Sequence, residues 1–165
     1  MTTEDHRPRG CVDLDRAEAL RLLGSVSLGR VVFTRHALPT VRPVNHVLDG
    51  CDIVIRTHKG AELTSYARRA DGAGVVVAYE ADAIDPDTHL GWSVVVTGYA
   101  RLVTDPDELA RYQRLPHPGV GYALDHAVRI HPGLVTGVRL TANGSPPPSA
   151  APVAGDGSQG ARSSP

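Results

Sequence analysis

A short run of cationic and hydroxyl side chains is the part of the sequence best suited to binding an anion. Arg56, Thr57 and Lys59 end a β-branched run and stand directly before Gly60, where a helix is expected to begin. An arginine offers a planar set of donors, a threonine a short donor and a lysine a point charge, and the first turn of a helix adds free amides. The pattern indicates a phosphate site, with an ordinary solvent-exposed strand end as the alternative.

A second polar run lies earlier in the chain. It consists of Arg42, Pro43, Val44, Asn45 and His46. Alternation along a strand places Arg42, Val44 and His46 on one face. Pro43 and Asn45 then lie on the other face, and Pro43 cannot donate a hydrogen bond to a neighbouring strand. The backbone around Pro43 is therefore free to pair with the edge of a planar heterocycle, or else the proline protects an edge strand from aggregation.

These two runs are expected to face each other across a hairpin. Residues 40–48 and 53–57 are both rich in β-branched side chains, and the Asp49-Gly50 pair between them is a common hairpin signal. A hairpin over residues 40–60 would present a row of polar groups to a phosphorylated ligand.

Few other residues suggest chemistry. Trp92 and Ser93 open a long apolar strand after Gly91 and offer a flat ring and a hydroxyl, although a lone tryptophan more often packs in a core. The eight histidines show no HxH or HxxxH spacing, so no metal site is expected. The sequence also lacks a phosphate loop, a GxGxxG motif and a GxSxG elbow. No catalytic side chain can be nominated, and such a chain can instead bind a cofactor that carries the chemistry.

The composition is that of a soluble globular domain. The 165 residues are 41% hydrophobic, and 17 basic against 18 acidic residues leave a net charge of -1, which disfavours nucleic acid as a partner. The apolar runs are much shorter than the ~20 residues that span a bilayer, so no membrane segment is expected. Cys11 and Cys51 form no CxxC pair and the N-terminus lacks an apolar signal core, which predicts a cytoplasmic protein with reduced thiols.

The chain is expected to form one domain, at residues 13–142, between two flexible ends. Residues 1–12 are polar, and residues 143–165 are rich in Gly, Pro, Ser and Ala and cannot repay the entropy of ordering. Helices are predicted over residues 13–23, 60–69 and 107–115. Strands are predicted over residues 25–36, 40–48, 53–57, 73–79, 92–103 and 128–140. Because strands and helices do not alternate regularly, they favour a mainly β protein, a small closed β-barrel with a few short helices outside it.

Several pieces of sequence, taken in their order, resemble a known family. The pieces are VVFT, RPVN with His46 and the Asp-Gly turn, IRT before a helix, and GWSVVVTGYA. Together they resemble the flavin-binding split β-barrel proteins of the pyridoxamine 5'-phosphate oxidase-like superfamily, in the branch that includes the nitroimidazole reductase-like flavoproteins. The resemblance covers residues 13–141 and implies a six- to seven-stranded split β-barrel.

The resemblance also implies a ligand and an assembly. Family members are homodimers with FMN bound in the cleft between the subunits. Carried over by position, Arg42 to Asn45 would line the isoalloxazine, partly through their backbone. Arg56 and Thr57 would hold the phosphate.

Two further pairs of residues and one departure complete the carry-over. Trp92 and Ser93 would complete the pocket, and His46 and Lys59 would be its neighbours. Family members usually carry Lys or Arg where this chain has Glu62, and a carboxylate at that position would repel the phosphate. Lys59 is a candidate substitute charge. The alternatives are weakened FMN binding or a different cofactor, such as a deazaflavin.

The activity implied by the resemblance is that of an FMN-dependent oxidoreductase. Such a protein passes hydride between a reduced nicotinamide and a small-molecule acceptor, and the flavin supplies the chemistry that the chain's own side chains lack. Two alternatives remain at this point. One is a flavin- or deazaflavin-binding protein without turnover, and the other is an interaction dimer that has lost the flavin.

Overall fold

The computed structural model describes residues 9–69, 72–115 and 124–142, and this part of the chain is mainly β. Its helices are α1 (Arg16–Leu23), α2 (Glu62–Ala67) and α3 (Pro106–Gln113). Its strands are β1 (Arg9–Asp13), β2 (Leu28–Arg35), β3 (Leu38–Asn45), β4 (Val47–Asp49), β5 (Asp52–Thr57), β6 (Val75–Ile84), β7 (Gly91–Leu102) and β8 (His126–Ala142). The three helices and most of the strands fall near the positions predicted from the sequence, whereas β1 lies in a segment predicted to be flexible. None of the described helices is long and apolar enough to cross a membrane.

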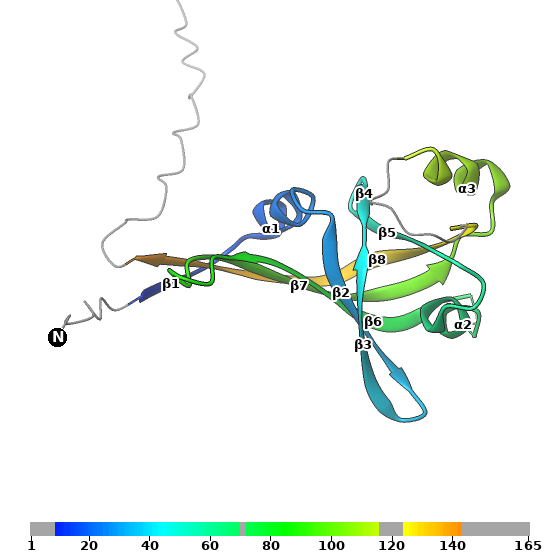
Figure 1. Ribbon diagram of the computed structural model, residues 1–165, viewed down its shortest axis with the longest axis horizontal. Coiled ribbons are helices and arrows are strands. Elements are labelled where there is room, and N and C mark those ends of the chain that lie inside the picture. The colour runs from blue at the N-terminus through cyan, green and yellow to red at the C-terminus, as the bar shows by residue number, and fades with distance from the viewer. Residues whose placement is uncertain (1–8, 70–71, 116–123, 143–165) are drawn as a thin grey trace, which may run out of the picture.

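The strands form one curled antiparallel sheet that is open along one side. Its order is β3-β2-β6-β7-β8-β5-β4, and β1 pairs with β8 outside this path. The long strands β7 and β8 run side by side, with β1 at one end and α2 and α3 towards the other (Figure 1). The end strands β3 and β4 form no ladder with each other, so the barrel is split. The split β-barrel class is therefore confirmed, with eight strands in the described residues where six or seven were expected. The closed barrel expected from the pattern alone is corrected.

The two ends of the chain were assigned to flexible segments. Residues 1–8 and 143–165 lie outside the described residues. Residues 9–12, however, belong to β1, which pairs with β8 from Arg9 opposite Ala142 to Asp13 opposite Val138. This pairing is possible because β8 continues to Ala142, beyond the predicted end at residue 140, and its backbone groups form hydrogen bonds with β1.

Local capping explains where two helices begin. Asp15 precedes α1, and its side chain accepts a hydrogen bond from the Glu18 amide at 2.8 Å. Asp105 does the same for the first amides of α3, and Pro106 occupies the first turn, where a missing N–H costs nothing. These aspartates end the extended segments before them and begin the helices that cover the sheet.

The hairpin predicted over residues 40–60 is only partly formed. The β3 strand ends at Asn45 and pairs with β2, whereas only the short β4 strand pairs with β5 across the turn at Gly50. The chain changes direction at His46, whose amide donates to the Ser27 carbonyl at 2.8 Å. The two polar runs therefore belong to strands on opposite sides of the split and are not paired in one ladder.

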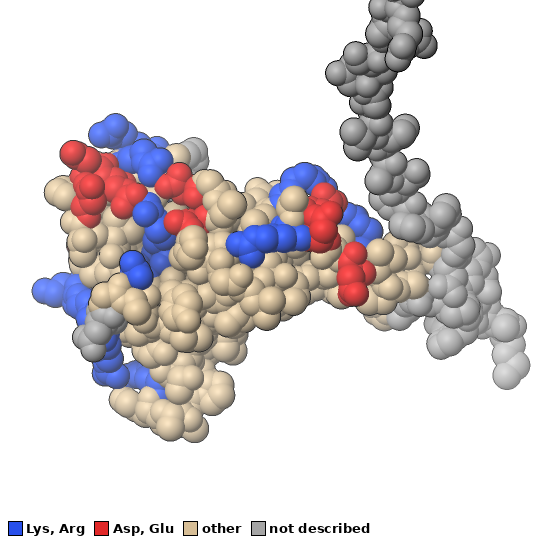
Figure 2. All heavy atoms as spheres, turned by 180° about the vertical axis from the view of Figure 1, so that it is seen from behind, with Lys and Arg blue, Asp and Glu red and all other residues tan. Residues whose placement is uncertain are grey.

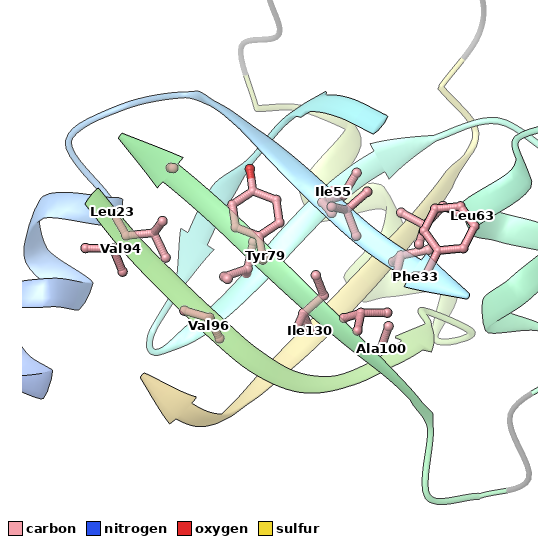
Figure 3. Packing of buried hydrophobic residues seen from close by; sticks show 14 of the residues in the cluster. Leu23, Phe33, Ile55, Leu63, Tyr79, Val94, Val96, Ala100 and Ile130 are labelled. Carbon is pink, nitrogen blue, oxygen red and sulfur yellow. The ribbon is translucent and has the colours of Figure 1, made fainter. Parts of the chain in front are cut away.

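The core fills the concave side of the sheet. Alternate residues of β7 are buried, and Val94, Val96 and Ala100 are inaccessible to solvent. They meet apolar side chains from β2, β5, β6 and β8, and from α1 and α2, including Tyr79 and Ile130 (Figure 3). Val, Ile and Leu side chains suit this role because branched side chains pack well on a pleated surface. The core fixes the positions of β3 and β5 relative to each other.

The long β7–β8 ladder contains one irregularity. Its register shifts between Thr97 and Gly98, opposite Pro132, which has no N–H to donate. A Cβ on Gly98 would lie 2.2 Å from the His131 carbonyl oxygen, so only glycine fits there. The predicted interruption of the last strand near residues 131–133 is thus a bulge within a continuous β8.

Candidate functional site

A cavity of about 430 Å³ opens where β3, β5 and the segment leading into α2 come together. Its walls are the last four residues of β3, the last three of β5, most of residues 58–63, and Leu124. This volume lies in the range of small-molecule sites, and the lining combines apolar side chains with a few cationic and polar ones. Six of the site residues predicted from the sequence lie here: Arg42, Pro43, Val44, Asn45, Arg56 and Thr57.

The cavity borders an edge of the sheet. The β3 strand stands at one end of the strand order, and Pro43 lies opposite Arg30 on its only neighbour, β2. A proline is tolerated there because an edge strand does not need all of its N–H groups for a ladder. The edge position predicted from Pro43 is confirmed. The backbone of β3 beyond that ladder is available to a ligand.

Arg56 is the clearest candidate for holding an anion in the cavity. One of its terminal nitrogens, Nη1, donates to the Leu115 carbonyl oxygen at 2.8 Å, which fixes the guanidinium. Its Nε is buried and has no hydrogen-bond partner among the described residues. Buried donors are rarely left unpaired, so an acceptor on a ligand would satisfy this one. The Arg56 side chain is therefore held in place and still has an unused hydrogen-bond donor.

The hydroxyl of Thr57 is already engaged within the protein. Thr57 is 6% exposed, and its Oγ1 lies 3.2 Å from Thr64 Oγ1. Because Thr64 donates its own proton to the His58 carbonyl oxygen at 2.9 Å, Thr57 must be the donor in the pair. Thr64, which sequence analysis did not single out, thus ties α2 to the end of β5. Thr57 reaches a ligand only through its remaining acceptor capacity or by a change of rotamer.

Glu62 is paired with two arginines from the β2–β3 hairpin. Its Oε2 lies 2.5 Å from Nη2 of Arg42, and its Oε1 accepts a hydrogen bond from Nη1 of Arg35. Arg42 also donates to the Val41 carbonyl oxygen at 2.9 Å. Arg35 was not among the predicted site residues, because nothing in its local sequence connects it with Glu62. The carboxylate expected to face a phosphate therefore already neutralises part of the positive charge at the cavity.

His46 and Lys59 do not line the cavity. His46 is 4% exposed, and its ring bridges the Leu23 carbonyl oxygen at 2.9 Å and the Tyr79 hydroxyl at 2.6 Å. Burial lowers the pKa of His46, although the bond to the Leu23 carbonyl acts in the opposite direction. Its position fits a structural role in turning the chain after β3. Lys59 is exposed on the turn that follows β5.

Trp92 and Ser93 lie at the start of β7, away from the cavity of the same chain. Trp92 is 7% exposed and packs in the core, the common role of a single tryptophan. Ser93 points to the other face of the sheet, where its hydroxyl donates to Glu80 at 3.5 Å. One chain by itself does not bring either residue to Arg56.

A separate charged cluster anchors α3 to the sheet. Tyr112 is 1% exposed, and its hydroxyl donates to Asp49 at 2.5 Å and accepts from Arg129. Arg111 also binds Asp49, at 2.7 Å, and hydrogen bonds from Arg111 and Tyr112 lower the pKa of that carboxyl. Figure 2 shows acidic and basic side chains intermixed around this helix. The mutual pairing indicates a structural role. Within the described residues no group of three or more metal-ligating side chains is present.

The chain is similar to a known protein family and to several solved structures. Residues 15–139 match the family model described as pyridoxamine 5'-phosphate oxidase. An uncharacterized protein of Mycobacterium tuberculosis is 54% identical over 139 residues, which cover 84% of this chain and 91% of that protein. Among solved structures, a candidate pyridoxamine 5'-phosphate oxidase from Corynebacterium glutamicum is 35% identical with a TM-score of 0.63, covering 80% of this chain and 99% of that one. An FAD binding protein from Mycobacterium smegmatis is 32% identical with a TM-score of 0.59, covering 79% and 98%.

Proposed function

Because the chain belongs to the pyridoxamine 5'-phosphate oxidase family, we propose that it is a flavoprotein that binds FMN in the cavity between β3 and β5 and acts as an oxidoreductase. The observation that carries the proposal is the buried, unpartnered Nε of Arg56 in the wall of a cavity of about 430 Å³. The name of the 32% identical relative, an FAD binding protein, supports a flavin as the class of ligand. A deazaflavin is the alternative within that class.

The residues of the cavity suit the parts of a flavin. The backbone from Arg42 to Asn45 offers polar groups along an edge strand, which match the edge of a planar ring system. Ile55 and Leu63 supply apolar surface, and Arg56 supplies a donor for the phosphate. The bound flavin would supply hydride transfer between a reduced nicotinamide and a small-molecule acceptor. The chain would bind and orient it.

A second copy of the chain would complete the site. The outward face of β6, β7 and β8 exposes large apolar side chains, and Val76, Val95, Tyr99 and Leu134 are between 39% and 64% exposed. Val76 lies opposite Tyr99 in the ladder, so these side chains share one face, and Ser93 lies on it too. Apolar patches of this kind often mark interfaces. A homodimer packed on this face is the proposed assembly, and Ser93 would then lie at the interface.

The visible spectrum of the purified protein tests the proposal. A yellow protein that releases FMN on denaturation, identified by mass, is the expected result. Anaerobic reduction of the bound flavin by NADH or NADPH would establish the oxidoreductase. A yellow protein that neither nicotinamide reduces would instead be a flavin-binding protein without this turnover. A colourless protein that takes up neither FMN, FAD nor a deazaflavin would refute the flavin site.

A further inference from the structure

The Glu62 side chain forms part of the wall between two cavities. One is the cavity of about 430 Å³ at Arg56, and the other is a cavity of about 270 Å³ between the β2–β3 hairpin and α2. Glu62 and Gly60 line both of them, whereas Arg42 lines the first and Arg35 the second. A single carboxylate thus lies where the two cavities meet, with one arginine towards each.

Charge attraction holds one oxygen of this carboxylate. Its Oε2 is cut off from solvent and makes no well-aligned hydrogen bond with the described residues, yet it lies 2.5 Å from Nη2 of Arg42. The side chains of Arg35 and Arg42 are both 50% exposed, against 28% for Glu62. Both guanidinium groups therefore have room to turn towards another anion. Carboxylate and phosphate are equivalent partners for a guanidinium, since each accepts its parallel N–H donors.

We propose that Glu62 is a resident counter-ion that competes with the phosphate of a ligand for Arg42, while Arg35 holds its other oxygen from the second cavity, and so sets how strongly the site prefers anionic over neutral flavins. The identification of the competing anion as a flavin phosphate rests on the proposed function, whereas the competition itself concerns any phosphate. A phosphate that enters the cavity gains Arg42 only when the Glu62 contact is loosened. The sequence predicted that the Glu62 carboxylate would repel a phosphate. This repulsion is reduced because two arginines already neutralise the carboxylate.

The test variant is Glu62→Gln, which keeps the shape of the side chain and removes its charge. Titration calorimetry at constant ionic strength would measure binding of inorganic phosphate, FMN and riboflavin to the variant and to the unmodified protein. We expect phosphate and FMN to bind about tenfold more tightly to the variant, equivalent to ~1.4 kcal/mol. Riboflavin, which has no phosphate, should bind equally to both. Adding Arg42→Ala to the variant should abolish most of the gain.

A matched control exists on the other side of the molecule. Glu18 also bridges two arginines, Arg21 and Arg139, but it lies on α1 and not at the cavity. Glu18→Gln should change none of the three affinities. Should Glu62→Gln fail to fold, Glu62→Ser removes the same charge and is expected to give the same direction of change.

The outcomes separate the two proposals. Equal phosphate and FMN affinities with and without the Glu62 charge would overturn the counter-ion role. Weaker binding of both after its removal would also overturn it and would make Glu62 a residue that positions Arg42 for the ligand. Tighter phosphate binding by a variant that takes up no flavin would support the counter-ion role while refuting the flavin site.

Discussion

The buried hydrogen bond between Tyr79 and His46 should contribute strongly to the stability of the fold around the candidate site. His46 Nε2 faces the Leu23 carbonyl oxygen, which can only accept, so Nε2 carries the proton and Nδ1 accepts from the Tyr79 hydroxyl. Tyr79 is inaccessible to solvent, and His46 is 4% exposed. A Cβ on Gly29 would lie 2.4 Å from the hydroxyl oxygen, so the backbone of β2 closes over it. Tyr79→Phe therefore leaves Nδ1 without its partner and without ready access to water.

The expected loss can be set from this geometry. An unsatisfied buried acceptor costs about 1–3 kcal/mol, so Tyr79→Phe should lower the free energy of unfolding by that amount. Urea denaturation at pH 7.5 and one fixed protein concentration would measure it. Tyr66→Phe is the control, because the Tyr66 hydroxyl makes only an exposed contact with the Val76 carbonyl oxygen at 3.4 Å and its loss should cost less than ~0.5 kcal/mol. Equal small losses in the two variants would refute the reasoning.

Three further outcomes are expected. Burial lowers the pKa of His46, so below pH ~6.5 the unfolded chain binds a proton more readily than the folded chain does. The free energy of unfolding, measured by urea denaturation, should therefore decrease as the pH is lowered, and it should decrease less in His46→Gln. Arg56→Ala should weaken FMN binding by ~1.5–3 kcal/mol in fluorescence titrations, whereas Arg21→Ala, on α1 and away from the cavity, should not. Tyr99→Glu should convert the proposed dimer to monomer in light scattering, and an unchanged mass would exclude this face.

The fold was largely predictable because its local signals agree with its packing. The aspartate caps of α1 and α3, the β-branched runs and Pro43 at an edge all act within a few residues of the features they specify. The hairpin over residues 40–60 was only partly right for the opposite reason. The change of direction at His46 depends on contacts with Leu23 and Tyr79, 23 and 33 positions away in the chain, which no local pattern contains.

The candidate site was likewise predictable only in part. The residue types that suit an anion, a planar ring and an edge strand could be selected from the sequence, and six of them line one cavity. Their existing partners could not be selected. Arg35 reaches Glu62 only because the β2–β3 hairpin folds beside α2, and the hydroxyl of Thr57 is engaged by Thr64 from the same helix. Both contacts change what the cavity residues can offer a ligand.

The open side of the barrel, between β3 and β4, exposes the charges of the candidate site to water. The guanidinium groups of Arg35 and Arg42 are half exposed, and exposed pairs with a carboxylate are weak because water and salt screen them. Any surface that covers the opening would remove water and strengthen every charge interaction beneath it. The balance between Glu62 and a ligand phosphate would then depend on whether the opening is covered, because each ion pair contributes more when it is shielded from water.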